Sequence, residues 1–153
     1  MFDVSSARSG DISQIQEIYL ALRRPKRPDL RLEDYLVARH CGSLVGCAAV
    51  QLVMLDSGLE GYLYGLAVRK EFQRKGIGAA LTEARMERVR ANDGTRGIAL
   101  AMFWNIGFFK KLGFETVRRH DLLPAILELP DFVDVRYRRS AVVVRRVAEW
   151  PSP

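Results

Sequence analysis

The sequence predicts an α/β fold of mixed α and β elements, in which a mostly antiparallel central sheet of six to seven strands carries helices on both faces. Three observations support this prediction. A tight turn at Gly42-Ser43 joins two predicted strands, of which the second is mostly apolar and β-branched, as in a hairpin. The segments 11–22 and 74–90 place apolar residues at helical spacing. A strand, a helix and another strand follow one another over 60–103, and hairpins before such a unit favour a mixed sheet.

The first half of the chain contains one long amphipathic helix and a hairpin. The helix starts at Gly10-Asp11, and its apolar residues recur every three to four positions, so that one face is buried. Two prolines and three basic residues then indicate a loop over 24–30. The elements expected in this half are, in order, a strand over 2–7, a helix over 11–22, the loop, a short helix over 32–36 and strands over 36–41 and 44–55.

The second half begins after a turn at Asp56-Ser57-Gly58. Asn92-Asp93-Gly94 has the composition of a helix end, so the second long helix should stop there. The elements expected in this half are a strand over 60–69, a helix over 74–90, a strand over 96–103, a short helix over 105–112 and strands over 114–118 and 141–147. No repeat or linker divides the sequence, which predicts a single domain over 1–153.

Composition narrows the class of protein. Hydrophobic residues make up 48% of the 153 residues and charged residues 27%, as is usual for a globular domain. No apolar run approaches the roughly 20 residues that span a bilayer, and the first residues lack the apolar stretch of a signal peptide, so we expect a cytoplasmic protein. His40 beside Cys41 does not have the spacing of a metal site. We therefore expect no metal, with Cys41 and Cys47 reduced and packed.

The formal net charge of +6 favours an anionic ligand. The basic residues are spread along the chain and are not interleaved with aromatic residues, which disfavours nucleic acid as a partner. No feature of the sequence indicates a membrane partner. A solvated basic surface with some attraction for an anionic cofactor fits this charge distribution best.

The segment Gln73-Arg74-Lys75-Gly76-Ile77-Gly78-Ala79 is the most informative stretch. It lies between a predicted strand and a predicted helix, where the first helical amides have no internal partner and the helix dipole is positive. Two glycines let an anion approach the backbone, and Arg74 and Lys75 add positive charge. The segment contains neither GxxxxGK[ST] nor GxGxxG. The residues alone leave a tight turn with an exposed basic pair as the alternative to a pyrophosphate site.

Gln73-Arg74-Lys75-Gly76-Ile77-Gly78 resembles the Q/R-x-x-G-x-G/A signature of the GNAT N-acetyltransferases. Phe108-Phe109-Lys110-Lys111-Leu112-Gly113-Phe114 is similar to the family's second signature, F-Y-x-x-x-G-F, and the order of elements agrees over nearly the whole chain. The resemblance implies a GNAT fold with acetyl-CoA as co-substrate and no metal. The cofactor-binding residues that it implies are Leu66, Ala67, Val68, Gln73, Arg74, Lys75, Gly76, Ile77, Gly78, Ala79, Asn105 and Phe109.

These residues are expected to bind different parts of acetyl-CoA. Backbone amides from Lys75 to Ala79 would hold the pyrophosphate, and the backbone of Leu66 and Val68 would pair with the pantetheine arm. Asn105 either contacts the pantetheine or caps the helix that follows it. Phe109 stands where the family often has the tyrosine that protonates the departing thiolate, so the acid is missing or is supplied by Tyr64, Tyr137 or water.

The expected catalytic residues lie on the strand before the loop. If alternate residues face one way, Glu60, Tyr62, Tyr64, Leu66 and Val68 share one face. Several family members have a base glutamate at the position that Tyr62 occupies here, and Glu60 on the same face is the candidate base, acting through a water. Tyr62 and Tyr64 are either half-buried strand aromatics or substrate contacts. Glu60 is equally compatible with an exposed carboxylate at a strand end. A backbone N–H of Leu66 or Ala67 would stabilise the oxyanion.

The acceptor is less closely defined. Leu123-Pro124 and the end of the chain, Arg138-Arg139-Ser140 followed by AVVVRRV, resemble small amino-acid N-acetyltransferases and favour a small amine acceptor. The arginines that suit a substrate carboxylate, unless they are merely solvated, are Arg23, Arg24, Arg27 and Arg138. The alternatives are acetylation of a protein or peptide, a non-catalytic module that binds acyl-CoA, and nucleic-acid binding through the basic tail. By analogy, the last strand is a candidate homodimer element.

Overall fold

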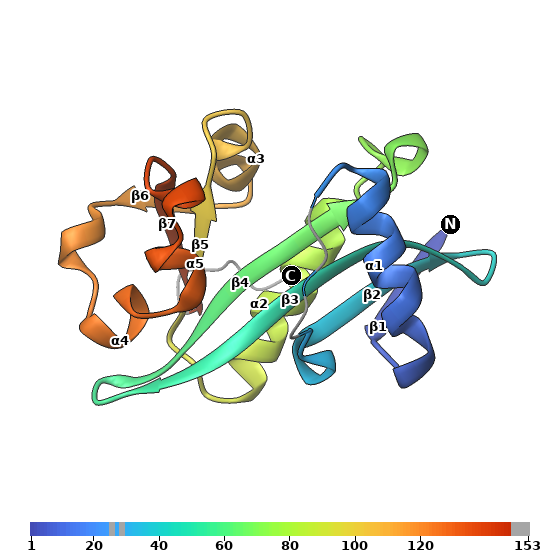
Figure 1. The fold of residues 1–153 in the computed structure, drawn as a ribbon. Helices are drawn as coiled ribbons and strands as arrows, with labels where there is room; N and C mark the ends of the chain where they lie inside the picture. Colours follow the sequence, from blue (N-terminus) through green and yellow to red (C-terminus); the bar gives the residue numbers. More distant parts are fainter. Residues whose placement is uncertain (25–26, 28–29, 148–153) are drawn as a thin grey trace. The chain divides into compact units, whose positions relative to one another are not determined.

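The computed structural model describes residues 1–24, 27 and 30–147 (Figure 1). Its strands form one seven-stranded sheet in the order β1-β2-β3-β4-β5-β7-β6. The strands are β1 Phe2–Ser6, β2 Tyr35–His40, β3 Ser43–Leu55, β4 Gly58–Val68, β5 Arg96–Ala101, β6 Glu115–Val117 and β7 Ala141–Arg146. The pairs β1–β2, β2–β3, β5–β7 and β6–β7 are antiparallel. The predicted mixed fold with a mostly antiparallel sheet is therefore confirmed.

The helices of the described residues are α1 Ile12–Ala21, α2 Ile77–Ala91, α3 Ile106–Lys111, α4 Pro124–Leu127 and α5 Pro130–Val133. Short 3-10 turns cover Ser9–Asp11, Leu32–Asp34, Lys70–Phe72, Arg119–Asp121 and Val135–Tyr137. The long helix starts at Ile77 and not at Arg74, because Arg74 and Gly76 have left-handed φ values of 62° and 86° that a helix cannot include. Pro25 and Lys26 of the predicted loop lie outside the described residues.

The chain divides into two compact units. The first contains Met1–Gln51 and Leu63–Glu87, and the second contains Leu52–Tyr62 and Arg88–Pro153. In the first unit, α1 and α2 cover opposite faces of the strands, and Figure 1 shows α1 in front of them and α2 behind. Successive β2 residues show the alternation expected of a strand buried on both sides: Tyr35 and Val37 pack with α1, whereas Leu36 and Ala38 pack with α2.

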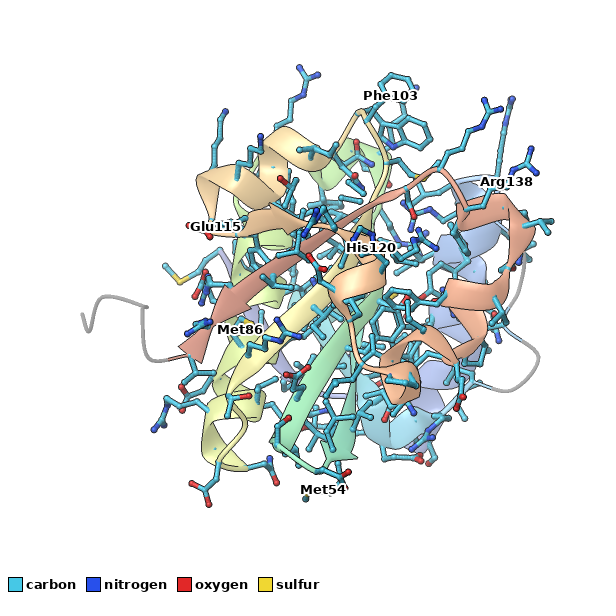
Figure 2. All side chains as sticks on the ribbon, turned by 90° about the vertical axis from the view of Figure 1, so that its left-hand side faces the viewer. Met54, Met86, Phe103, Glu115, His120 and Arg138 are labelled. Atoms are coloured by element: carbon cyan, nitrogen blue, oxygen red, sulfur yellow. The ribbon has the colours of Figure 1, made fainter. Side chains whose placement is uncertain are left out.

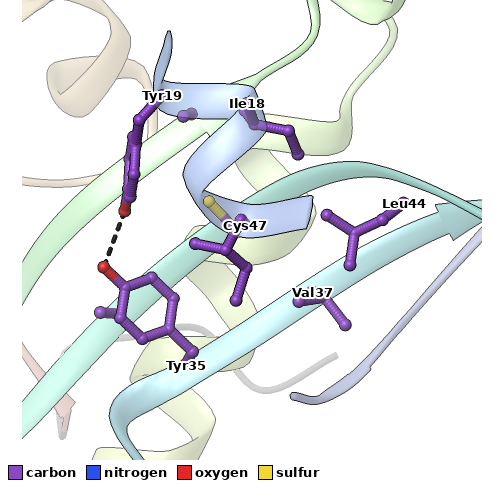
Figure 3. Packing of buried hydrophobic residues seen from close by; sticks show 9 residues of the cluster. Ile18, Tyr19, Tyr35, Val37, Leu44 and Cys47 are labelled. Carbon is purple, nitrogen blue, oxygen red and sulfur yellow. Dashed lines mark hydrogen bonds between the residues drawn. The ribbon is translucent and has the colours of Figure 1, made fainter. Parts of the chain in front are cut away.

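The core of the first unit is tight on both faces. On the α1 face, Ile18 and Tyr19 pack against Tyr35, Val37 and Cys47 (Figure 3). On the α2 face, a Cβ added to Gly46 would lie 3.3 Å from the Ala67 carbonyl oxygen and from the side chains of Ile77 and Leu81. The helix that follows the basic loop therefore sits directly on β3, which fixes the position of its first turn.

The second unit is built around β7. Val142, Val143 and Val144 are buried, because β7 lies between β5 and β6 and has neighbours on both edges. Two aromatic residues remain outside this core. Phe103 is 82% exposed and projects from the loop after β5 (Figure 2), where its ring meets Trp104 edge-on.

The two cysteines differ in their surroundings. Cys47 is buried in the first unit, as predicted, but Cys41 is exposed in the β2–β3 turn with φ of 51°. The prediction that Cys41 is packed is therefore wrong, because a turn of this kind leaves its side chain in solvent. The neighbouring His40 forms a hydrogen bond between its Nδ1 and the Met1 carbonyl oxygen at 2.7 Å, and its ring packs against Phe72. In the described part of the chain, no helix is long and apolar enough to cross a bilayer.

Candidate active site

The basic loop leads from β4 into α2 and has the geometry of an anion site. Gly76 has φ of 86°, and a Cβ added there would meet no atom within 4 Å, so the space beside its backbone is open. Arg74, Lys75 and Gly76 are exposed, whereas Ile77 is buried and anchors the first turn of the helix. The loop therefore exposes its backbone and its positive charge to solvent, while the buried Ile77 holds the start of the helix in place.

Backbone amides converge at the start of α2. The first helical hydrogen bond runs from the Ala80 N–H to the Gly76 carbonyl oxygen at 3.0 Å. The amides of Ile77, Gly78 and Ala79 precede it and have no acceptor inside the helix. At 15 residues, α2 is long enough for a full dipole, whose positive end lies at these amides. This end of the helix therefore has the features of an anion site.

Side chains of the loop stabilise its shape. The Gln73 side-chain amide donates to the Val68 carbonyl oxygen at 2.9 Å and closes the end of β4. The Lys75 amine lies 5.5 Å from the centre of the Phe72 ring, a cation–π distance that holds its charge at the loop. Gln73 thus acts as a structural bridge in this structure, and Arg74 and Lys75 supply the positive charge.

Strand β4 is irregular immediately before the loop. Gly65 has φ of 68°, and this left-handed residue interrupts the alternation of faces. Tyr64 packs with the α1 cluster, whereas Leu66 and Val68 pack with the α2 cluster. The prediction that Tyr64, Leu66 and Val68 share one face is therefore wrong, because the chain turns over at Gly65.

Three consecutive carbonyl groups at this bulge accept hydrogen bonds from three different elements. The Arg85 guanidinium on α2 donates to the Tyr64 carbonyl at 3.4 Å, and the Tyr19 hydroxyl on α1 donates to the Gly65 carbonyl at 2.7 Å. The third bond, 2.6 Å long, runs from Arg24 to the Leu66 carbonyl. The backbone direction of β4 is thus fixed at the strand segment predicted to supply the oxyanion amide.

Arg85 is a fully buried cation that has no carboxylate partner among the described residues. Its guanidinium also donates to the Ala49 carbonyl oxygen at 3.3 Å and to the Thr82 hydroxyl at 2.9 Å. Burial lowers the pKa of Arg85 to about 10, which still leaves it charged at neutral pH. The Thr82 hydroxyl donates in turn to the Gly78 carbonyl, so the bulge is linked to the first turn of α2.

Tyr64 is held by acidic and basic neighbours. Its hydroxyl donates to Asp34 at 2.6 Å, and the Arg27 guanidinium lies 4.9 Å from its ring centre. Burial, followed by the hydrogen bond to Asp34, raises the pKa of Tyr64 well above its usual range. A phenol so placed is a poor proton donor to a thiolate, which weighs against Tyr64 as the missing acid.

Glu60 and Tyr62 belong to the second unit. Glu60 is buried, and its Oε2 accepts a hydrogen bond from the Arg96 Nε at 2.8 Å, while its Oε1 has no partner among the described residues. The Tyr62 hydroxyl donates to Asp131 at 2.7 Å, and its ring leans on Phe132. Glu60 is therefore not the exposed carboxylate that a strand end suggested.

Asn105 and Phe109 also lie in the second unit. Asn105 occupies the N-cap position of α3 but makes no capping hydrogen bond, and its buried Oδ1 has no partner among the described residues. Such an atom costs free energy unless something donates to it, which favours a ligand contact over a cap. Phe109 is buried between Phe108 and Phe114, with ring centres 5.2 Å away on each side.

Sequence reasoning missed Tyr19, Asp34 and Arg85. Arg85 carried a signal, since it lies four residues after Leu81 and continues the buried stripe of α2. A charged residue on an apolar stripe indicates a polar partner inside the core. Tyr19 was expected to be buried, but no local pattern indicates that its hydroxyl reaches Gly65, which lies 46 residues away.

Comparisons with known proteins agree with this geometry. Residues 31–116 match the Acetyltransferase (GNAT) domain family. An uncharacterized N-acetyltransferase of Chlorobaculum tepidum, CT2212, is 31% identical over 124 residues, which are 76% of this chain and 77% of that protein.

Two solved structures extend the comparison. N-acetylglutamate synthase from Neisseria gonorrhoeae, complexed with coenzyme A and N-acetyl-glutamate, superimposes with a TM-score of 0.83 and 25% identity. The match covers 96% of this chain and 35% of that one, so the chain spans about a third of that protein. Arabidopsis thaliana Naa50, complexed with the bisubstrate analogue CoA-Ac-MVNAL, shares the fold at a TM-score of 0.72 and 19% identity, over 94% and 97% of the two chains.

Proposed function

The chain belongs to the GNAT family of acetyltransferases, and we propose that it transfers an acetyl group from acetyl-CoA to the amine of a small molecule that also carries a carboxylate. The observation that carries this proposal is the loop over 73–79. Its glycine backbone, exposed basic residues and amides without helical acceptors form an anion site at the start of α2, directly after a bulged strand.

The residues fit acetyl-CoA at two independent places. The amides of Ile77, Gly78 and Ala79 provide donors for the pyrophosphate, and Arg74 and Lys75 add charge. In the second unit, the Asn105 Oδ1 is a buried acceptor without a described partner, as an amide-rich pantetheine requires. We assign the backbone of Leu66, Ala67 and Val68 to the same arm.

Two arginines support a carboxylate on the acceptor. The Arg24 guanidinium reaches the Leu66 carbonyl, and the Arg27 guanidinium stacks on Tyr64, so both cations border the bulged part of β4. Arginine pairs with a carboxylate through two parallel hydrogen bonds. The complex of the Neisseria synthase with N-acetyl-glutamate supports the same class of acceptor.

The reaction that we propose is direct attack of a neutral amine on the thioester carbonyl. A carbon–nitrogen bond forms and the carbon–sulfur bond breaks, while a β4 amide donates to the oxyanion that develops. Glu60 accepts the proton of the amine through a water held at its Oε1. The sulfur leaves as thiolate and takes a proton from water, since Phe109 has none to give.

The function is tested with acetyl-CoA and a panel that pairs amino acids with their decarboxylated amines and also contains short peptides. We expect acetylated amino acids, identified by mass spectrometry because the exposed Cys41 would interfere with thiol reagents. The decarboxylated partners should react more slowly. Products formed with peptides alone would replace this proposal by peptide acetylation, and the absence of any product would favour a module that binds acyl-CoA without catalysis.

Replacing Glu60 with glutamine is expected to lower kcat about 100-fold, since the variant keeps the shape of the side chain and loses the base. Arg96→Gln is the matched control, because it breaks the same 2.8 Å ion pair but leaves the carboxylate in place. We expect the control to retain most of the activity in steady-state assays with the best amine. Equal losses in both variants would show that the broken ion pair, and not a missing base, lowers kcat.

A further inference from the structure

The bulge in β4 is held by a buried pair of tyrosines. The Tyr19 hydroxyl donates to the Gly65 carbonyl oxygen at 2.7 Å and lies 2.8 Å from the Tyr35 hydroxyl (Figure 3). The Cys47 thiol approaches the same carbonyl at 3.9 Å. Tyr19 and Tyr35 are 2% and 1% exposed, so water does not compete for these groups.

Each tyrosine hydroxyl of this cluster donates to a single acceptor. A phenol hydroxyl has one proton to donate. Because the proton of Tyr19 goes to Gly65, the proton between the two hydroxyl groups must come from Tyr35. Tyr35 therefore donates a hydrogen bond to the Tyr19 hydroxyl oxygen. Of the two tyrosines, only Tyr19 donates to the Gly65 carbonyl.

The hydrogen bond to Gly65 also orients the next amide. A trans peptide is planar, and its C=O and N–H point in opposite directions. Since the Gly65 carbonyl points at Tyr19, the N–H of Leu66 points away from α1. By the same argument, Arg24 orients the Ala67 N–H through the Leu66 carbonyl, but Arg24 is exposed and its position is the less restrained of the two.

We propose that Tyr19 is a positioning residue for acetyl transfer, because its hydroxyl fixes the Leu66 N–H as the donor to the oxyanion. This inference rests on the proposed function and selects Leu66 over Ala67 as the amide that acts. Burial raises the pKa of the Tyr19 phenol well above its usual range, so Tyr19 stays protonated and remains a donor at neutral pH. Tyr35 does not contact Gly65 in this way, but its hydrogen bond to Tyr19 helps to hold the Tyr19 hydroxyl in position.

The inference is tested with three variants and the best amine of the panel. Tyr19→Phe keeps the ring and removes the donor, so kcat should fall on the order of 10- to 100-fold while KM for acetyl-CoA stays nearly constant. Tyr35→Phe removes an equally buried hydroxyl but keeps the hydrogen bond from Tyr19 to the Gly65 carbonyl, so kcat should fall at most about threefold. The double variant, Tyr19→Phe with Tyr35→Phe, leaves no unpaired hydroxyl in the core.

The double variant separates positioning from stability. Its Tm should recover toward that of the wild type, because removing both partners of a buried hydrogen bond costs less than removing one. Its kcat should stay as low as that of Tyr19→Phe, because the donor to Gly65 is still missing. A kcat that recovers together with Tm would overturn the inference and leave Tyr19 with a structural role.

A second readout does not depend on catalysis. In ¹⁵N-labelled protein, loss of the hydrogen bond to Gly65 should shift the Leu66 amide nitrogen in Tyr19→Phe more than in Tyr35→Phe. Equal kcat in Tyr19→Phe and wild type would overturn the inference while acetyl transfer stands. A wild type that acetylates no amine would overturn the proposed function, and this inference with it, even where the Leu66 signal shifts as expected.

Discussion

Replacing Gly76 with glutamate is expected to abolish the stabilisation that acetyl-CoA gives to the wild-type protein. A ligand at roughly 100 times its Kd adds about 2.7 kcal/mol to the free energy of unfolding and raises Tm. The new carboxylate would project into the open space beside the loop, where we propose that the pyrophosphate binds. Repulsion between the two negative charges should then remove the binding that we assign to the amides of Ile77 and Gly78. Thermal unfolding with and without acetyl-CoA measures the effect.

Gly42→Glu is the matched control for this variant. Gly42 has φ of 79°, close to the 86° of Gly76, and a Cβ added at either position meets no atom within 4 Å. Both variants therefore carry the same backbone strain of about 1–2 kcal/mol and the same change of charge. The control should lose stability but keep the shift with acetyl-CoA. If Gly76→Glu keeps the shift as well, the pyrophosphate does not bind at this loop.

The position of the loop between β4 and α2 could be predicted from the sequence, because the residues that decide it are local. Two glycines, a basic pair and the start of a helix lie within seven residues, and each acts through its own backbone or charge. The boundary of α2 was the error. Arg74 takes a left-handed conformation that few non-glycine residues adopt, and helical periodicity alone does not reveal it.

The bulge at Gly65 was beyond prediction because distant residues decide it. Alternation places Tyr64 and Leu66 on one face of an ideal strand, and the structure separates them. The donors that hold the reversed backbone, Tyr19 and Arg85, lie 46 and 21 residues from the carbonyls they bind. A single glycine in a strand indicates a bulge or a close approach, but the sequence does not say which group approaches.

In the second unit, too, local sequence patterns predicted the strand β7 but not the contacts between residues far apart in the sequence. The apolar run over 141–147 predicted a strand, but not that its pairing with both β5 and β6 would bury it. The short helices α4 and α5 were not predicted, since four residues each are too few to show a helical period. The ion pair between Glu60 and Arg96 joins residues 36 apart, and no motif links them.

Replacing Gly65 with alanine is expected to destabilise the protein by about 2–5 kcal/mol. Its φ of 68° costs an L-residue about 1–2 kcal/mol, and an added Cβ would lie 2.5 Å from the Tyr19 hydroxyl oxygen. That contact forces the hydroxyl off the Gly65 carbonyl, which leaves buried polar groups unpaired at a further cost of about 1–3 kcal/mol. Urea unfolding measures the total, and Gly10→Ala, at a position with open space, should change it little.

A double-mutant cycle divides this loss between the backbone and the contact. Tyr19→Phe removes the oxygen that an alanine at position 65 would strike, whereas the nearest ring carbon would remain at an ordinary 3.7 Å. The Tyr35 hydroxyl oxygen, at 3.2 Å, also remains near the new Cβ and has to shift by only a few tenths of an ångström. The double variant, Gly65→Ala with Tyr19→Phe, should therefore be more stable than the sum of the single changes predicts, by about 1 kcal/mol or more. Strict additivity would mean that the strain lies in φ alone and that the hydroxyl moves aside without cost. In that case Tyr19 does not restrain the Gly65 peptide, and the Leu66 amide takes its direction from the strand itself.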